Sequence, residues 1–90
     1  MTKKRDHVDI IEDMLLSIQS KGGEIKPTHL MYKSNLSHVQ MKSYLEELLE
    51  KEFIQKVKKN EYDYITITVK GCEFLNVVHK MKEFDKTFGI

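Results

Sequence analysis

Four histidines, a run of glutamates and one cysteine are the side chains that could support metal binding or catalysis in this 90-residue chain. His7, His29, His38 and His79 never fall three, four or five residues apart. Those spacings would place two imidazoles on one helix face as metal ligands. A single cysteine, Cys72, excludes an internal disulfide and a Cys-rich zinc site. We therefore predict no metal and no cofactor.

The acidic segment 46–52 carries four glutamates, and paired carboxylates are common in acid–base catalysis. Glu47 and Lys51, however, stand in the i,i+4 order that stabilises an exposed helix. A solvated helix face is therefore the better interpretation. Gly22-Gly23 lacks the other glycines of a phosphate loop, and no serine is convincingly paired with a base. The sequence thus predicts no enzyme.

Length and composition restrict the remaining classes. Ninety residues limit the chain to a single domain, 1–90, with a thin core, so oligomerisation would help it to be stable. The net charge is +1, with 40% hydrophobic and 32% charged residues, which is typical of a globular chain. No apolar run approaches the roughly 18 residues of a membrane span, and the N-terminus lacks an apolar signal core. We expect a cytoplasmic, intracellular protein without a membrane partner.

Hydrophobic periodicity predicts two helices in the first third of the chain. The first runs from Arg5 to about Lys21 and ends at Gly22-Gly23. Residues 24–26 are too few for anything but a turn or a single strand-like link. A brief second helix starts at Pro27 and breaks at residues 34–35. The expected inward stripe of the first helix comprises Val8, Ile11, Met14, Leu15 and Ile18.

The third helix has the clearest start signal. Ser37 and Gln40 have the spacing of a capping box, and Leu36 and Met41 that of a hydrophobic staple, so the helix should begin at His38. Its inward stripe is Met41, Leu45 and Leu48, and its outward face is Val39, Ser43, Glu46 and Glu50.

After residue 52 the period changes to two, which predicts strands over 53–57 and 62–67, joined by a basic tip at 58–61. Thr68 should cap a last helix that reaches about Phe88. Leu75 and Val78 offer this helix a face for its own domain, which leaves a second, coiled-coil-like seam for a homodimer. The seam residues are Phe74, Val77, Met81, Phe84 and Phe88.

Positive charge collects in two segments despite the low total. Residues 22–45 and 53–61 each hold three lysines against one glutamate, whereas 46–52 holds one lysine against four glutamates. Binding to nucleic acid depends on where such cations lie, because they release counterions from the phosphates. The start of the third helix carries small and polar side chains of the kind that face base edges in the major groove. The distribution therefore favours double-stranded DNA as a partner.

Residues 28–54 resemble small archaeal winged helix-turn-helix regulators, including those of archaeal viruses. The shared segments are Leu-Met-Tyr-Lys at 30–33, Asn-Leu-Ser at 35–37, Tyr-Leu at 44–45 and Leu-Leu-Glu-Lys at 48–51. Lys70-Gly71 and Phe74-Leu75 extend the resemblance over nearly the whole chain. One departure is Glu52, where such sequences commonly have glycine.

The resemblance implies an α+β winged helix-turn-helix with three helices, a two-stranded wing and a C-terminal dimerisation helix over 69–88. It also implies a homodimer that binds double-stranded DNA in a sequence-specific manner and regulates transcription, without a small-molecule substrate. By position, residues 37–43 would face the groove and 56–62 would form the wing. The predicted DNA-contacting residues are Thr28, Lys33, Ser37, His38, Val39, Gln40, Lys42, Ser43, Lys56, Lys58, Lys59, Asn60 and Tyr62.

Several of these assignments have a second interpretation. Gln40 could contact a base or serve only the capping box, and Val39 could meet a thymine methyl or be an incidental surface valine. Lys58 and Lys59 could contact phosphate or the minor groove, or they could serve only solubility. A solvated start is favoured over a phosphate-binding arm for residues 3–5. A buried reduced thiol is favoured over an intersubunit disulfide for Cys72. The rival function is a winged-helix protein–protein interaction module that does not touch DNA.

Overall fold

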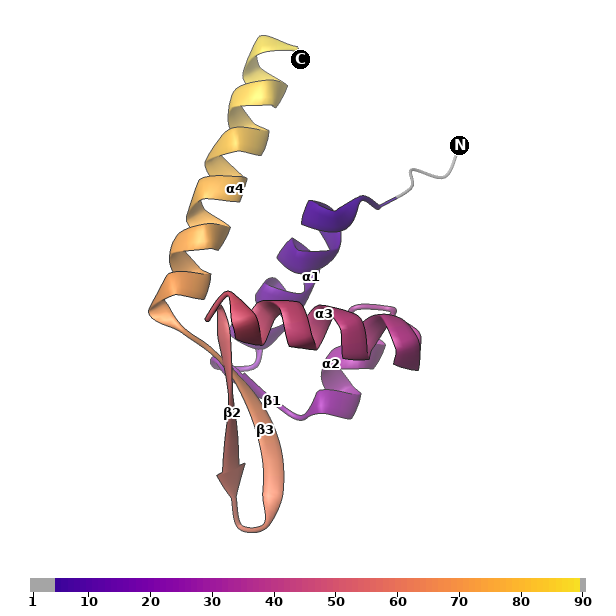
Figure 1. The fold of residues 1–90 in the computed structure, drawn as a ribbon. Helices are drawn as coiled ribbons and strands as arrows, with labels where there is room; N and C mark the ends of the chain where they lie inside the picture. Colours follow the sequence, from indigo (N-terminus) through magenta and orange to yellow (C-terminus); the bar gives the residue numbers. More distant parts are fainter. Residues whose placement is uncertain (1–4, 90) are drawn as a thin grey trace.

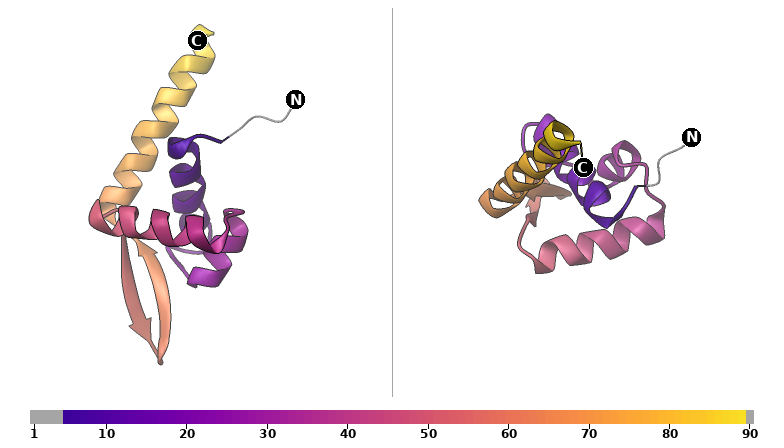
Figure 2. Two further views of the ribbon diagram at one scale, coloured as in Figure 1. Left: turned by 45° about the vertical axis from the view of Figure 1, so that its right-hand side comes forward. Right: turned by 90° about the horizontal axis from the view of Figure 1, so that it is seen from above.

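The computed structural model describes residues 5–89, apart from the side chain of Phe88. The elements are α1 (His7–Ser20), β1 (Glu24–Ile25), α2 (Pro27–Lys33), α3 (His38–Glu50), β2 (Ile54–Lys59), β3 (Tyr62–Ile67) and α4 (Val69–Phe88). Helices α1 to α3 gather at the centre, the β2–β3 hairpin extends to one side, and α4 extends to the other (Figures 1 and 2). This arrangement confirms the predicted α+β fold with a wing and a long C-terminal helix.

The sheet contains one strand more than the sequence predicted. Its order is β1-β3-β2, all antiparallel, and Ile25 of β1 pairs with Ile65 of β3. The two-stranded wing is therefore extended by the link after α1 into a three-stranded sheet. Ile25, Ile54 and Ile65 are buried, and they join the side chains of α1, α2 and α3 in one core.

The predicted four-residue basic tip of the hairpin is wrong. Lys59 pairs with Tyr62, so the loop consists only of Asn60 and Glu61. Their φ angles are 48° and 70°, as a type I′ turn requires, and this turn matches the twist of the flanking strands. Lys58 and Lys59 consequently lie within β2, and the outermost charge of the wing is acidic.

The first three helices end in the same hydrogen-bonded motif. A left-handed residue follows each C-cap, and the next N–H donates back to the carbonyl three positions before the C-cap. The donor and acceptor pairs are Gly23 and Ile18, Leu36 and Met31, and Phe53 and Leu48, at 2.9, 3.1 and 3.0 Å. The left-handed residues are Gly22, Asn35 and Glu52, with φ of 79°, 55° and 62°. The second of these turns sets the direction of α3, and the third sets that of the wing.

Glu52→Gly should raise the free energy of unfolding by about 1 kcal/mol. The left-handed conformation costs a residue with a Cβ roughly 1–2 kcal/mol, and part of this gain is offset by the greater freedom of glycine in the unfolded chain. Urea denaturation would measure the change. Glu46→Gly is the matched control, because it places glycine at an exposed position inside α3 and should destabilise the chain by about 1 kcal/mol. A Glu52→Gly chain that is less stable than the parent would refute this account of the turn.

Helix α4 starts directly on the turn between α3 and β2. The Thr68 hydroxyl accepts a hydrogen bond from the Gly71 N–H at 3.0 Å and donates to the Glu52 carbonyl at 2.6 Å. The Thr68 N–H donates to the Phe53 carbonyl at 3.1 Å. A Cβ at Gly71 would lie only 2.3 Å from that carbonyl oxygen, so the close approach requires glycine there. The predicted cap at Thr68 is confirmed.

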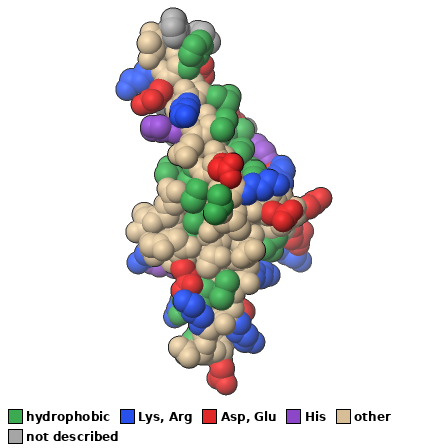
Figure 3. All heavy atoms as spheres, turned by 90° about the vertical axis from the view of Figure 1, so that its left-hand side faces the viewer, with side chains coloured by type: hydrophobic (Ala, Val, Ile, Leu, Met, Phe, Trp, Pro, Cys, Tyr) green, Lys and Arg blue, Asp and Glu red, His purple; other side chains and the backbone are tan. Residues whose placement is uncertain are grey.

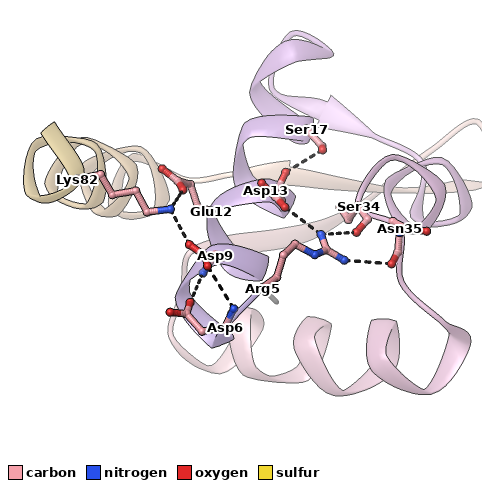
Figure 4. A network of polar contacts seen from close by, with 9 residues as sticks. All are labelled: Arg5, Asp6, Asp9, Glu12, Asp13, Ser17, Ser34, Asn35 and Lys82. Carbon is pink, nitrogen blue, oxygen red and sulfur yellow. Dashed lines mark hydrogen bonds and ion pairs between the residues drawn. The ribbon is translucent and has the colours of Figure 1, made fainter. Parts of the chain in front are cut away.

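Arg5, which lies just before α1, connects this end of the helix to the turn between α2 and α3 (Figure 4). Its Nη1 donates to Asp13 Oδ2 at 2.9 Å and to the Ser34 carbonyl at 2.8 Å, and its Nη2 donates to the Asn35 carbonyl at 3.1 Å. The expectation of a solvated start is thus wrong for Arg5, because carbonyls left free at the end of α2 attract a cation. Lys3 and Lys4 lie outside the described residues.

Two side chains lie differently from the predicted pattern. Val8 is 42% exposed, and Ile10 takes its place in the core of α1. Cys72 is half-buried instead of fully buried, and its free thiol lies 3.4 Å from Gln19 Nε2. Both residues lie where α1 and α4 run past one another, and this packing could not be deduced from the period of either helix alone.

Candidate nucleic-acid interface

The start of α3 is built by the predicted capping box. The Gln40 N–H donates to Ser37 Oγ at 3.2 Å, and the Ser37 N–H donates to Gln40 Oε1 at 3.0 Å. Leu36 and Met41, the predicted staple, are both buried. The cap therefore fixes how the first turn of α3 is presented, while Gln40 itself stays exposed. Its contact with a base remains a prediction.

The outward face of α3 is open to solvent over its first two turns. Val39 is 80% exposed, and with Lys42, Ser43 and Glu46 it lines a shallow depression on this face. The buried stripe is Met41 and Leu48, with Leu45 partly buried, as predicted. An apolar side chain as exposed as Val39 has no role in the core of this chain, so it is free to contact a partner.

All thirteen predicted DNA-contacting residues are exposed, and they fall into separate groups. Residues 37–43 form one continuous stretch at the start of α3, and Thr28 lies on the neighbouring α2. Lys33 is directed elsewhere, because its Nζ lies 3.2 Å from Ser20 Oγ at the end of α1. The remaining five, Lys56, Lys58, Lys59, Asn60 and Tyr62, belong to the β2–β3 hairpin.

The wing lysines point to two different faces of the sheet. Residues directly opposite in an antiparallel pair share a face, and neighbours along a strand alternate. Lys56 pairs with buried Ile65, so Lys56 and Lys58 lie on the face that continues the core, whereas Lys59 lies with Tyr62 on the other face. Lys59 Nζ is 3.0 Å from a Glu24 carboxylate oxygen. Part of its charge is therefore neutralised within the chain.

Lys26 is a basic residue at this surface that is not among the predicted DNA-contacting residues. Its Nζ lies 4.8 Å from the centre of the exposed Tyr62 ring, in a cation–π contact. Lys26 is one of the three lysines that make residues 22–45 positively charged, so the sequence did indicate a basic residue there. Its position beside the wing follows from the pairing of β1 with β3, which the sequence did not indicate.

At the acidic end of α3, Glu47 takes part in ion pairs and does not face the candidate surface. Glu47 Oε2 lies 2.7 Å from Lys51 Nζ and 2.7 Å from His7 Nε2. The hydrogen bond from Lys51, followed by that from His7, lowers the pKa of Glu47 despite partial burial. The predicted i,i+4 pair of Glu47 and Lys51 is confirmed. The contact of Glu47 with His7 connects α3 to the start of α1. Glu46 differs, because it lies on the outward face beside Lys42.

The face of α4 predicted as a dimer seam is apolar and exposed along most of its length. Val77, Met81 and Phe84 are 56%, 61% and 56% exposed, and apolar side chains follow α4 outward from the centre of the molecule (Figure 3). Phe74 is an exception, because it is partly buried and stacks on Phe53 with ring centres 4.7 Å apart. The side chain of Phe88 lies outside the described part of the chain.

Within residues 5–89, no group of three or more His, Cys, Asp or Glu side chains is arranged to hold a metal ion. The helices of that same part of the chain include none with the length and apolar character needed to cross a membrane.

Comparison with known proteins identifies a family, a sequence relative and structures of similar fold. Residues 4–86 match the sequence profile of the family described as winged helix-turn-helix. The uncharacterized protein MJ0290 of Methanocaldococcus jannaschii is 37% identical over 78 residues, which cover 87% of this chain but only 34% of that protein. The chain therefore spans about a third of the length of this curated relative.

Two solved structures share the fold at low sequence identity. Sso10a-2, a DNA-binding protein from Sulfolobus solfataricus, has a TM-score of 0.79 at 18% identity, covering 93% of this chain and 85% of that one. F93 from STIV, a winged-helix DNA-binding protein, has a TM-score of 0.74 at 13% identity, covering 93% and 95%.

Proposed function

Because this chain belongs to the winged helix-turn-helix family, we propose that it binds double-stranded DNA in a sequence-specific manner as a homodimer and regulates transcription. The observation that carries the proposal is the relative position of three surfaces. Helix α4 extends from the centre of the molecule on the side opposite the wing (Figures 1 and 2). It therefore does not cover the exposed start of α3 or the outer part of the wing. A duplex could therefore meet α3 and the wing while α4 pairs with a second copy.

The chemistry of α3 suits the major groove, which is about 12 Å wide and admits one helix. Apart from the buried Met41, the leading residues from Ser37 to Ser43 are exposed, and they include a lysine but no carboxylate. The glutamates begin at Glu46, so a helix that enters by its N-terminal end keeps most of the acidic charge away from the phosphates. The positive end of the α3 dipole points the same way.

The wing would add contacts to the DNA backbone. Lys56 and Lys58 are exposed, and backbone contacts of this kind position a protein on the duplex without reading sequence. Sso10a-2 and F93 are both described as DNA-binding, which supports the same activity here. Regulation of transcription rests on the resemblance of the sequence to archaeal regulators.

A homodimer would place two copies of α3 in successive major grooves on one side of the duplex. The binding site should then be a palindrome with half-sites about 34 Å apart, or a multiple of that distance. Selection of bound sequences from a random pool of duplexes would test the proposal. We expect a palindromic consensus to emerge.

Retention on non-specific duplex DNA at low salt provides the contrast with a protein-interaction module. A DNA-binding chain is retained and elutes as salt increases, since the interaction releases counterions. A chain that passes through unretained and yields no consensus would refute the proposal in favour of the interaction module.

A further inference from the structure

Helix α4 is attached to α1 at two separate points. Near the start of α4, Gln19 Nε2 lies 3.4 Å from Cys72 Sγ. Ten residues further along, Lys82 Nζ lies 2.6 Å from Asp9 Oδ1 and 2.5 Å from Glu12 Oε1 (Figure 4). At about 1.5 Å per residue these attachments lie roughly 15 Å apart along the axis of α4. Two points so separated fix the direction of the helix as well as its position.

The second attachment is stronger than a typical surface ion pair. One ammonium group lies between two carboxylates from successive turns of α1, and the Glu12 side chain is only 13% exposed. Hydrogen bonds with Asp9 and then Glu12 raise the pKa of Lys82, because both carboxylates stabilise the charged ammonium. Loss of the ammonium would leave the largely buried Glu12 carboxylate without a partner, which is costly.

The burial of apolar side chains on α4 decreases before this attachment is reached. Leu75 and Val78 are buried, whereas Met81 on the next turn is 61% exposed. Beyond Val78, the ion pairs of Lys82 with Asp9 and Glu12 hold α4 against α1.

The angle at which α4 is held has a direct consequence if α4 is the dimer helix, as in the proposed function on which this inference rests. The longest dimension of the molecule is 49 Å, and a dimer axis on the outer part of α4 would leave about half of that length, on the order of 25 Å, between the axis and α3. A change of about 10° in the angle would displace each copy of α3 by roughly 4 Å, which exceeds the rise of about 3.4 Å per base pair.

We propose that Lys82 is a positioning residue that sets the separation of the two DNA half-sites at which the homodimer binds. Lys82 does not touch DNA in this scheme. It acts by holding α4 at one angle through Asp9 and Glu12, so the dimer tolerates only a narrow range of separations.

The test compares binding of the full chain to duplexes that carry the selected half-sites at separations differing by single base pairs. The parent should bind its preferred separation about tenfold more tightly than a separation one base pair longer, since a wrong separation must be met by deforming the DNA. Lys82→Met should lower this ratio to about threefold or less while leaving dimerisation and non-specific DNA binding unchanged.

Two further variants distinguish a positioning role from a general structural one. Lys82→Arg keeps a cation between the carboxylates and should restore the sharp preference. Lys80→Met removes the same charge from α4 at an exposed position that makes no ion pair among residues 5–89, and it should behave like the parent.

A Lys82→Met chain that keeps the parental preference, or that becomes monomeric, would overturn the proposal. A parent chain that is itself monomeric would overturn the proposed homodimer and this inference with it.

Discussion

A chain carrying both Met81→Glu and Phe84→Glu should sediment as a monomer at concentrations where the parent is a dimer. Met81 and Phe84 are 61% and 56% exposed in the single chain, so the substitutions leave its core intact. In a symmetric dimer they would bring four carboxylates into an apolar contact. Each buried unpaired charge costs several kcal/mol, so the dimer dissociation constant should rise by about a thousandfold or more.

The same variant should lose most of its affinity for a palindromic site. A monomer binds one half-site only. In the dimer, binding of the first half-site raises the effective concentration of the second subunit at its own half-site, which typically increases the overall affinity by a factor of about 10² to 10⁴. Asn76→Glu with His79→Glu is the matched control, because both residues are exposed and lie off the seam on the same helix. Sedimentation velocity measures the outcome. If the chain with Met81→Glu and Phe84→Glu is still a dimer, the seam is not the interface.

Alanine at both Lys56 and Lys58 should weaken binding to every duplex sequence by about a hundredfold at moderate salt. A homodimer has two wings, so the double substitution removes four cations from the phosphate backbone. The slope of log Kobs against log salt should become shallower by up to about 4, since each phosphate contact contributes about 0.9. Fluorescence anisotropy over a salt series measures affinity and slope together.

The control for the wing is an equal loss of charge on α4. Lys80→Ala with Lys86→Ala lowers the net charge identically on the helix that points away from the wing, and it should leave the slope nearly unchanged (Figure 1). Lys59→Ala should have a smaller effect than Lys58→Ala, because Glu24 already neutralises part of the Lys59 charge. Equal salt slopes for the wing variant, the α4 variant and the parent would remove the wing from the binding surface.

Local sequence signals predicted the helices well. The capping box of Ser37 and Gln40 and the cap at Thr68 each need only residues within three positions of one another, and both occur as predicted. The exposed face of α3 followed from its period in the same way. Such features do not depend on contacts with distant parts of the chain.

Contacts between distant segments were not predictable by these means. The addition of β1 to the sheet depends on a two-residue pairing with β3, too short to leave a periodic signal. The role of Arg5 depends on carbonyls about thirty positions away, and that of Lys82 on carboxylates about seventy positions away. Phe74 fits the heptad spacing of the seam, yet Phe53 holds it partly in the core.

In the proposed function, the start of α3 and the wing act together as one DNA-binding surface. A titration of the isotope-labelled chain with its selected duplex, followed by amide chemical shifts in NMR spectra, tests this most directly. The largest changes should fall within residues 37–43 and 56–62, with smaller ones near Lys26 and Thr28. Changes confined to residues 46–52 or to α4, or saturating changes in α3 with none in the wing, would contradict the claim.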